Sequence, residues 1–223
     1  IQDFIEQLGE LPSTLTVERI DPKAETQRYT EKILEHKGQG QSDEAKKLIL
    51  EDLKSPCTEE VAVFHAFSKA ISMAKRKFVV MDTAPTGHTL LLLDTAGSYH
   101  RDIMRNNINA GRLRTPYMSL QDQTLSKIIL VSLPETTPMR EAGDLQNDLK
   151  RANIRPYAWL INQSLSMLDG ISDPLLKSRA NAETQVINTI KNTYAERTYG
   201  IPFIAEKKLL PELLEGYLNT PTT

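Results

Sequence analysis

The sequence predicts a doubly wound α/β fold with a mainly parallel sheet and a helical insertion. Short apolar runs suited to buried strands occur at residues 78–81, 128–131, 158–161 and 201–205. Helical patterns follow several of these runs, and strands that alternate with helices are typical of a parallel sheet. The alternation stops between residues 22 and 76, where helical patterns occur without a strand.

The four strands are expected to be covered on both faces, because each run is continuously apolar and does not alternate. They read Phe78-Val79-Val80-Met81, Ile128-Ile129-Leu130-Val131, Ala158-Trp159-Leu160-Ile161 and Ile201 to Ala205. A further run, Leu15 to Ile20, alternates between apolar and polar residues and is expected nearer the edge of the sheet.

Helices are expected where apolar residues recur on one face. In residues 138–152 that face holds Ala142, Leu145, Leu149 and Ala152. In residues 173–197 it holds Leu176, Ala180, Ile187, Ile190 and Tyr194. The pattern at residues 207–218 predicts one more helix, whose leucines are better explained as core residues than as a docking surface.

The insertion at residues 22–76 is expected to contain three helices. The last begins at Ser55-Pro56, a capping residue followed by a first-turn proline, and buries Val61, Phe64, Phe67 and Ile71. We therefore divide the chain into the start of an α/β core at 1–21, the insertion at 22–76 and the remainder of the core at 77–223.

Composition narrows the possible functions. Lys+Arg 27 against Asp+Glu 29 gives a net charge of −2, and without a basic run the chain is not expected to bind nucleic acid. No apolar run approaches the roughly 20 residues that span a bilayer, so we expect no direct membrane insertion. Cys57 is the only cysteine, which excludes an internal disulfide and fits a reducing cytoplasm.

The most informative motif is Asp82-Thr83-Ala84-Pro85-Thr86-Gly87-His88-Thr89, directly after the apolar run 78–81. Ligands of open α/β sheets bind beyond the carboxyl ends of the strands. An aspartate in that position holds Mg²⁺ or its bound water in nucleotide hydrolases. The alternative is an aspartate that only caps the following helix.

A phosphate-binding loop would be the natural companion of Asp82, but the chain contains no Gly-Lys pair. Gly38 and Gly40 lie in a polar segment without a preceding strand, so we interpret them as a helix break. These 223 residues alone are therefore expected not to hydrolyse ATP.

Asp82 to Thr89 resembles the signature of the arsenite-stimulated ATPase family, which includes ATPases that target tail-anchored membrane proteins. Three other segments resemble family segments in the same order: Ser55-Pro56-Cys57-Thr58-Glu59-Glu60, Leu133-Pro134-Glu135-Thr136-Thr137-Pro138 and Trp159-Leu160-Ile161-Asn162-Gln163-Ser164-Leu165. The resemblance covers most of residues 13–220 and implies the fold of a phosphate-loop nucleotide hydrolase. In the family the phosphate-binding loop precedes the region at which this chain begins, so we interpret the chain as a C-terminal fragment resembling the second catalytic half.

The resemblance implies a catalytic loop of Asp82, Thr83 and Gly87 that works with ATP and Mg²⁺. It also implies that Cys57, with His88 and Ser55, belongs to a site for arsenite or antimonite. A thiolate is the soft ligand that such a metalloid prefers, and imidazole is a plausible second ligand. One thiol cannot complete this site, so other cysteines are expected from a second ATPase half or subunit. By base rate alone, a lone cysteine is a small buried apolar residue and a loop histidine is a packed one.

Asn162 resembles the family asparagine that reads the adenine edge, and one amide offers the donor and the acceptor this needs. A turn residue that satisfies the local backbone is an equally good explanation without the resemblance. Pro202, in the segment Pro202-Phe203, resembles a residue that lines the base pocket. For Glu135 and Thr136 we prefer a role in capping the next helix.

These features favour an ATPase that drives export of arsenite or antimonite through a membrane pump subunit, from a cytoplasmic position peripheral to the membrane. Metalloid ligation at His88 would act on Asp82 through a connection of six residues. One alternative is a tail-anchor targeting ATPase, disfavoured by scattered methionines and by the absence of a C-x-x-C pair. Another is a metalloid-binding regulatory module without hydrolysis.

Overall fold

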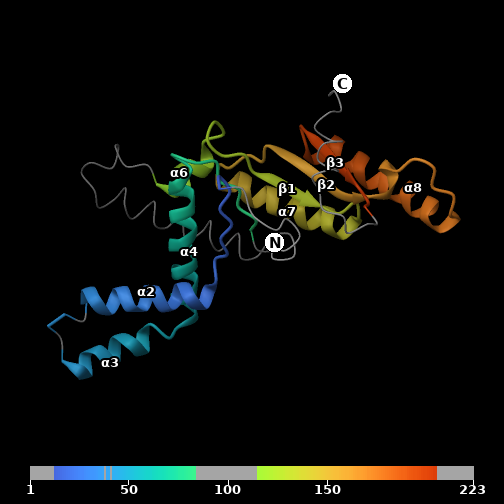
Figure 1. Cartoon of the computed structure of the whole chain (residues 1–223). Helices are drawn as coiled ribbons and strands as arrows, with labels where there is room; N and C mark the ends of the chain where they lie inside the picture. The colour runs from blue at the N-terminus through green and yellow to red at the C-terminus, as the bar shows by residue number, and fades with distance from the viewer. Residues whose placement is uncertain (1–12, 38, 41, 84–114, 205–223) are drawn as a thin grey trace. The chain divides into compact units, whose positions relative to one another are not determined.

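The computed structural model describes residues 13–37, 39–40, 42–83 and 115–204. The chain divides into two compact units, one of Ile20–Pro202 and one of Ile1–Arg19 with Phe203–Thr223. In the second unit the described residues are 13–19 and 203–204, and these form neither helix nor strand. Within the first unit, described residues form a helical segment and an α/β segment (Figure 1).

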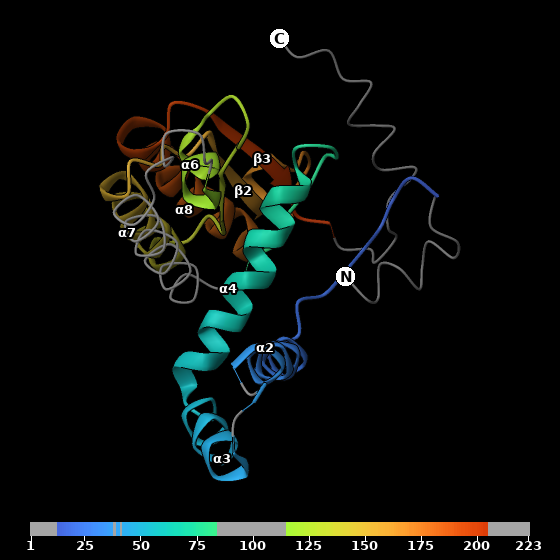
Figure 2. The same cartoon turned by 90° about the vertical axis from the view of Figure 1, so that its left-hand side faces the viewer.

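The helical segment consists of α2 (Pro22–Lys37), α3 (Asp43–Asp52) and α4 (Pro56–Met73), as the sequence predicts (Figures 1 and 2). A polar turn with Gly40 at φ +76° separates α2 from α3. Helix α4 packs against α2, where the ring of His65 stacks on Tyr29 at 5.4 Å between centroids. Its buried apolar residues are Ala62, Phe64, Phe67 and Ile71.

The α/β segment contains a parallel sheet of three strands in the order β1-β2-β3, which confirms the predicted fold class. The strands are β1 (Ile129–Ser132), β2 (Ala158–Ser164) and β3 (Thr198–Pro202). The helices of this segment are α6 (Pro116–Gln121), α7 (Thr136–Arg151) and α8 (Pro174–Thr189), with a short 3₁₀ helix at Leu165–Met167 and a π-helical turn at Ile190–Tyr194.

The core lies between one face of this sheet and the helices α7 and α8. Leu130, Trp159 and Ile161 project from that face and are at most 4% exposed. Their helical partners are Met139, Ala142, Leu149, Ile187 and Ile190. The apolar positions predicted for residues 138–152 therefore do face the sheet, since Leu145 and Ala152 also pack against this cluster.

Several strand predictions were wrong. Residues 78–81 form no strand, and Phe78 and Val80 are 94% and 81% exposed, because no described strand pairs with this segment. Likewise, Leu15–Ile20 forms no strand. The strand predicted at 201–205 instead spans Thr198–Pro202. It begins earlier because the backbone N–H of Trp159 donates to the carbonyl of Arg197, which precedes the apolar residues.

The sequence predicts that both faces of the sheet are covered, but among the described residues only one face is. On the face of the sheet opposite the core, Ile129 and Val131 are 50% and 58% exposed. The burial of β1 therefore alternates along the strand, although its sequence does not. Two smaller predictions also need correction, since Leu176 of α8 is exposed and Val61 of α4 is only partly buried.

Candidate functional site

The carboxyl ends of the three strands meet at one edge of the sheet, which is where ligands of open α/β sheets bind. Glu135 follows β1, Asn162 lies in the last half of β2, and Pro202 ends β3. Ser164 of β2 is paired with Pro202 in the register of these strands. Asn162 and Pro202, the two residues that the sequence suggests for base binding, thus lie on adjacent strands near this edge.

Asn162 lies in an irregular stretch of β2. The pairing with β3 shifts between Ile161 and Ser164, and Gln163 has a left-handed backbone with φ +58°. Bulges of this kind occur next to active sites, where they change the direction of a side chain. The Asn162 side chain is partly exposed, and no described residue hydrogen-bonds to its amide group. The amide donor and acceptor are therefore available to a ligand.

At the end of β1, helix α7 begins at Thr136, and Glu135 occupies the capping position. The Glu135 side chain makes no capping hydrogen bond, so the capping role expected for it is not observed. Its Oε1 accepts instead from Arg179 Nη2 of α8 over 2.9 Å. A cleft of about 260 Å³ lies between the loop after β1 and α8, and Glu135 and Arg179 both line it.

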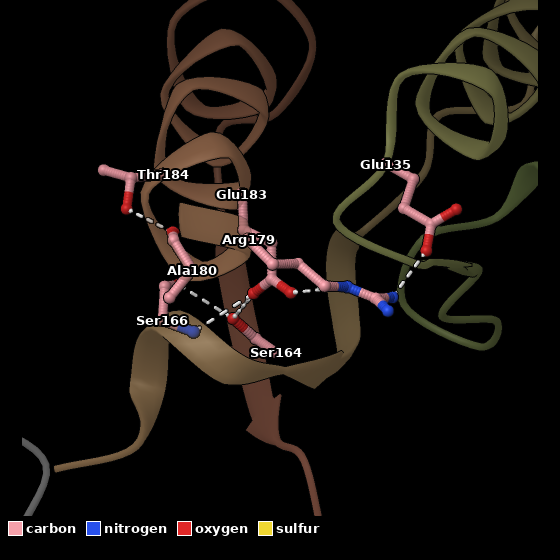
Figure 3. Close-up of polar contacts among 7 residues, drawn as sticks. All are labelled: Glu135, Ser164, Ser166, Arg179, Ala180, Glu183 and Thr184. Carbon is pink, nitrogen blue, oxygen red and sulfur yellow. Dashed lines mark hydrogen bonds and ion pairs between the residues drawn. The ribbon is translucent and has the colours of Figure 1, made fainter. Parts of the chain in front are cut away.

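A buried carboxylate on α8 was missed by the sequence reasoning. Glu183 is 3% exposed, and its Oε2 accepts from the Ser164 hydroxyl and from the Ser166 backbone N–H, each over 3.1 Å (Figure 3). A signal was present, because position 183 shares the apolar face of α8 with Ala180 and Ile187 at helical spacing. A charged residue on such a face predicts a buried polar contact.

The signature loop is only partly described. Asp82 and Thr83 are exposed and lie outside regular secondary structure. Gly87 and His88 lie outside the described residues.

Cys57 is exposed in the first turn of α4. Ser55 occupies the capping position, although its side chain caps no backbone N–H, and its hydroxyl lies 3.2 Å from that of Thr58. Cys57 is thus not the buried apolar residue that base rates suggest. Within the described ranges, no three His, Cys, Asp or Glu side chains gather closely enough to hold a metal ion.

Comparison with known proteins identifies the family. The sequence profile of the anion-transporting ATPases matches residues 2–120 and 103–216. The chain belongs to this family. Among the family's arsenical pump-driving ATPases, that of Escherichia coli is 52% identical over 195 residues, covering 87% of this chain. That of Acidiphilium multivorum is 52% identical over 193 residues, or 86% of the chain.

A more distant relative is the putative arsenical pump-driving ATPase 2 of Aquifex aeolicus, which is 27% identical over 93% of this chain and 79% of its own length. The chain spans about a third of the length of the Escherichia coli and Acidiphilium relatives, since the aligned region is 33% of each. None of the helices in the described part combines the length and apolar character needed to cross a membrane.

Proposed function

We propose that the chain is part of an ATPase that hydrolyses ATP to energise export of arsenite or antimonite through a membrane pump, and that metalloid binding stimulates hydrolysis. The observation that carries this proposal is the 52% identity with the arsenical pump-driving ATPase of Escherichia coli over 87% of the chain. Within the family, this identity favours the arsenical function over the targeting of tail-anchored membrane proteins.

The nucleotide is proposed to bind along the carboxyl edge of the sheet. Asn162 would read the adenine edge through its unpaired amide, and Pro202 on the neighbouring strand would line the base pocket. Mg²⁺ prefers hard oxygen ligands, which the exposed Asp82 carboxylate supplies. When bound, the ion would neutralise charge on the phosphates, with Asp82, Thr83 and Gly87 forming the catalytic loop.

The metalloid is proposed to bind at Cys57, with His88 and Ser55 beside it. The exposed thiol is open to a thiophilic ligand, and α4 is proposed to carry it in an insertion at 22–76 between the core segments 1–21 and 77–223. Further cysteines would come from a second ATPase half or subunit. Pump association would then be cytoplasmic and peripheral to the membrane.

ATP hydrolysis by the intact ATPase, measured with and without arsenite, tests the proposal. Cys57→Ser and His88→Ala should each reduce stimulation by arsenite, because each removes a proposed metalloid ligand. Basal turnover of Cys57→Ser should stay close to that of the wild type, because Cys57 lies on α4 and outside the proposed catalytic loop. His36→Ala, an exposed position in α2, is the matched control and should behave as wild type. Unchanged stimulation and unchanged metalloid affinity in His88→Ala would exclude that residue from the site.

The isolated 223 residues should bind ATP poorly, because the sequence contains no Gly-Lys pair to cradle the phosphates. Isothermal titration calorimetry of this chain with Mg-ATP measures the affinity directly. Tight binding would contradict the proposed division of the nucleotide site.

A further inference from the structure

The buried carboxylate of Glu183 has no role in the functions proposed above. A buried charge is costly unless hydrogen bonds or an opposite charge compensate it. Its Oε2 accepts two hydrogen bonds from the segment that follows Asn162 (Figure 3). Its Oε1 has no hydrogen-bond partner among the described residues and lies 3.8 Å from Arg179 Nε. An apolar residue would fill this position on α8 without that cost.

The two hydrogen bonds to Glu183 hold the end of β2. The donors, Ser164 Oγ and Ser166 N–H, lie one and three residues after Gln163, whose φ is +58°. A residue other than glycine adopts this conformation only when its surroundings compensate the strain. Glu183 provides such compensation from a different element, because it belongs to α8.

Asn162 lies between two fully buried residues of β2. Ile161 before it and Ser164 after it are both 0% exposed, whereas Asn162 is partly exposed. The direction of the Asn162 amide therefore depends on the backbone path through Gln163, and that path is held by the hydrogen bonds to Glu183.

Arg179 extends this contact to the neighbouring loop. Its Nη2 lies 2.9 Å from Glu135 Oε1 in the loop after β1, and its Nε lies 3.8 Å from Glu183 Oε1 (Figure 3). Arg179 and Glu135 are 60% and 49% exposed, and ion pairs as exposed as these contribute little. We therefore expect the effect to depend on Glu183 and only weakly on Arg179.

We propose that Glu183 is a positioning residue for nucleotide recognition, which orients the Asn162 amide toward the adenine edge by holding the bulge of β2. This inference rests on the proposed role of Asn162. Glu183 itself touches no nucleotide in this scheme. Its effect should therefore be specific to the base and should disappear when Asn162 is removed.

The test measures binding of ADP and GDP to the intact ATPase by calorimetry, with steady-state hydrolysis as a second readout. Asn162→Ala and Glu183→Ala should each raise the Kd for ADP about tenfold, the order expected for loss of a paired amide–base contact. In Glu183→Ala the Kd for GDP and the value of kcat should stay close to those of the wild type, because Glu183 itself touches no nucleotide. Glu183→Gln should restore most of the ADP affinity, because its amide oxygen accepts the same hydrogen bonds.

A double-mutant cycle separates positioning from general stability. Asn162→Ala/Glu183→Ala should bind ADP no more weakly than Asn162→Ala alone. The matched control is Thr184→Ala, since Thr184 neighbours Glu183 on α8 and, among the described residues, its hydroxyl donates only to the Ala180 carbonyl of the same helix. If Glu183→Ala does not fold, Ser164→Ala removes one donor and should raise the Kd for ADP about threefold.

Three outcomes would overturn the inference. Equal losses of affinity for ADP and GDP in the Glu183 and Ser164 variants would show that Glu183 has only a structural role. Multiplicative losses in the double variant would show that Glu183 does not act through Asn162. An unchanged Kd for ADP in Asn162→Ala would refute the adenine assignment itself, whatever Glu183→Ala does.

Discussion

Gln146 of α7 and Trp159 of β2 form a buried hydrogen bond, in which the indole N–H donates to Gln146 Oε1 over 2.8 Å. Gln146 Nε2 also donates to the Tyr194 carbonyl over 2.9 Å, while the Tyr194 ring stacks on Trp159 at 5.4 Å. One amide side chain therefore joins α7, the sheet and the π-helical turn of Ile190–Tyr194.

Replacing Gln146 should destabilise the fold strongly. Gln146→Leu leaves the buried indole N–H and the partly buried Tyr194 carbonyl without their partners, and a buried polar group without a partner costs about 1–3 kcal/mol. We expect a loss of about 3 kcal/mol in the free energy of unfolding, measured by urea denaturation with circular dichroism.

Trp159→Phe provides the control, because it removes the indole donor at the same contact. The double variant Gln146→Leu/Trp159→Phe should then lose less stability than the sum of the single variants. Strict additivity would show that this hydrogen bond does not contribute as described.

Gly143→Ala should destabilise α7, although alanine is normally the better helix residue by about 1 kcal/mol. A Cβ at this position would lie 2.7 Å from Tyr194 Cε1, and overpacking of this kind costs about 1–3 kcal/mol. Thermal unfolding should show a lowered Tm. Asn147→Ala, at an exposed position of the same helix, should be neutral or stabilising. A Tm raised by Gly143→Ala would mean that Tyr194 moves aside without cost.

His65 should make the packing of α2 on α4 depend on pH. His65 is exposed, but partial desolvation of its ring, and secondarily the Lys32 ammonium of α2, lowers the pKa of His65 below its ordinary value. The folded state thus favours the neutral ring that stacks on Tyr29. The stabilisation is complete above pH 6.5, the ordinary value, and is lost as the pH falls through the lowered pKa of the folded state.

Thermal unfolding of wild type and His65→Phe between about pH 7.5 and 5 checks this expectation, since the ordinary histidine pKa of 6.5 lies within that pH range. Phenylalanine keeps a ring against Tyr29 but cannot bind a proton. The wild type should lose more Tm than His65→Phe as the pH falls, while His36→Gln should follow the wild type. Parallel curves for wild type and His65→Phe would contradict the expectation.

Cys57 should react with a maleimide in the native protein. The 223 residues contain one cysteine, and its side chain is exposed in the first turn of α4. Mass spectrometry should therefore find one label on this chain without denaturant and none on Cys57→Ser. Labelling only after unfolding would show that the thiol is covered.

Much of the fold could be predicted from the sequence, because apolar periodicity reports locally which face of an element is buried. The beginning of α4 at Ser55-Pro56 and the core face of α7 followed from such patterns. The run 78–81 could not be interpreted in this way, since a strand also needs a partner and none of the described strands pairs with it.

The sequence by itself determined the family, the order of the segments and the residue types that suit nucleotide and metalloid. Only the tertiary structure decided that Asn162 and Pro202 lie on adjacent strands, that Glu135 pairs with Arg179 rather than capping α7, and that Glu183 accepts hydrogen bonds from the end of β2. The physical reason is that these contacts join residues far apart in the chain. Periodicity predicts which face of a helix is buried, but it does not predict the donor that a buried carboxylate meets there.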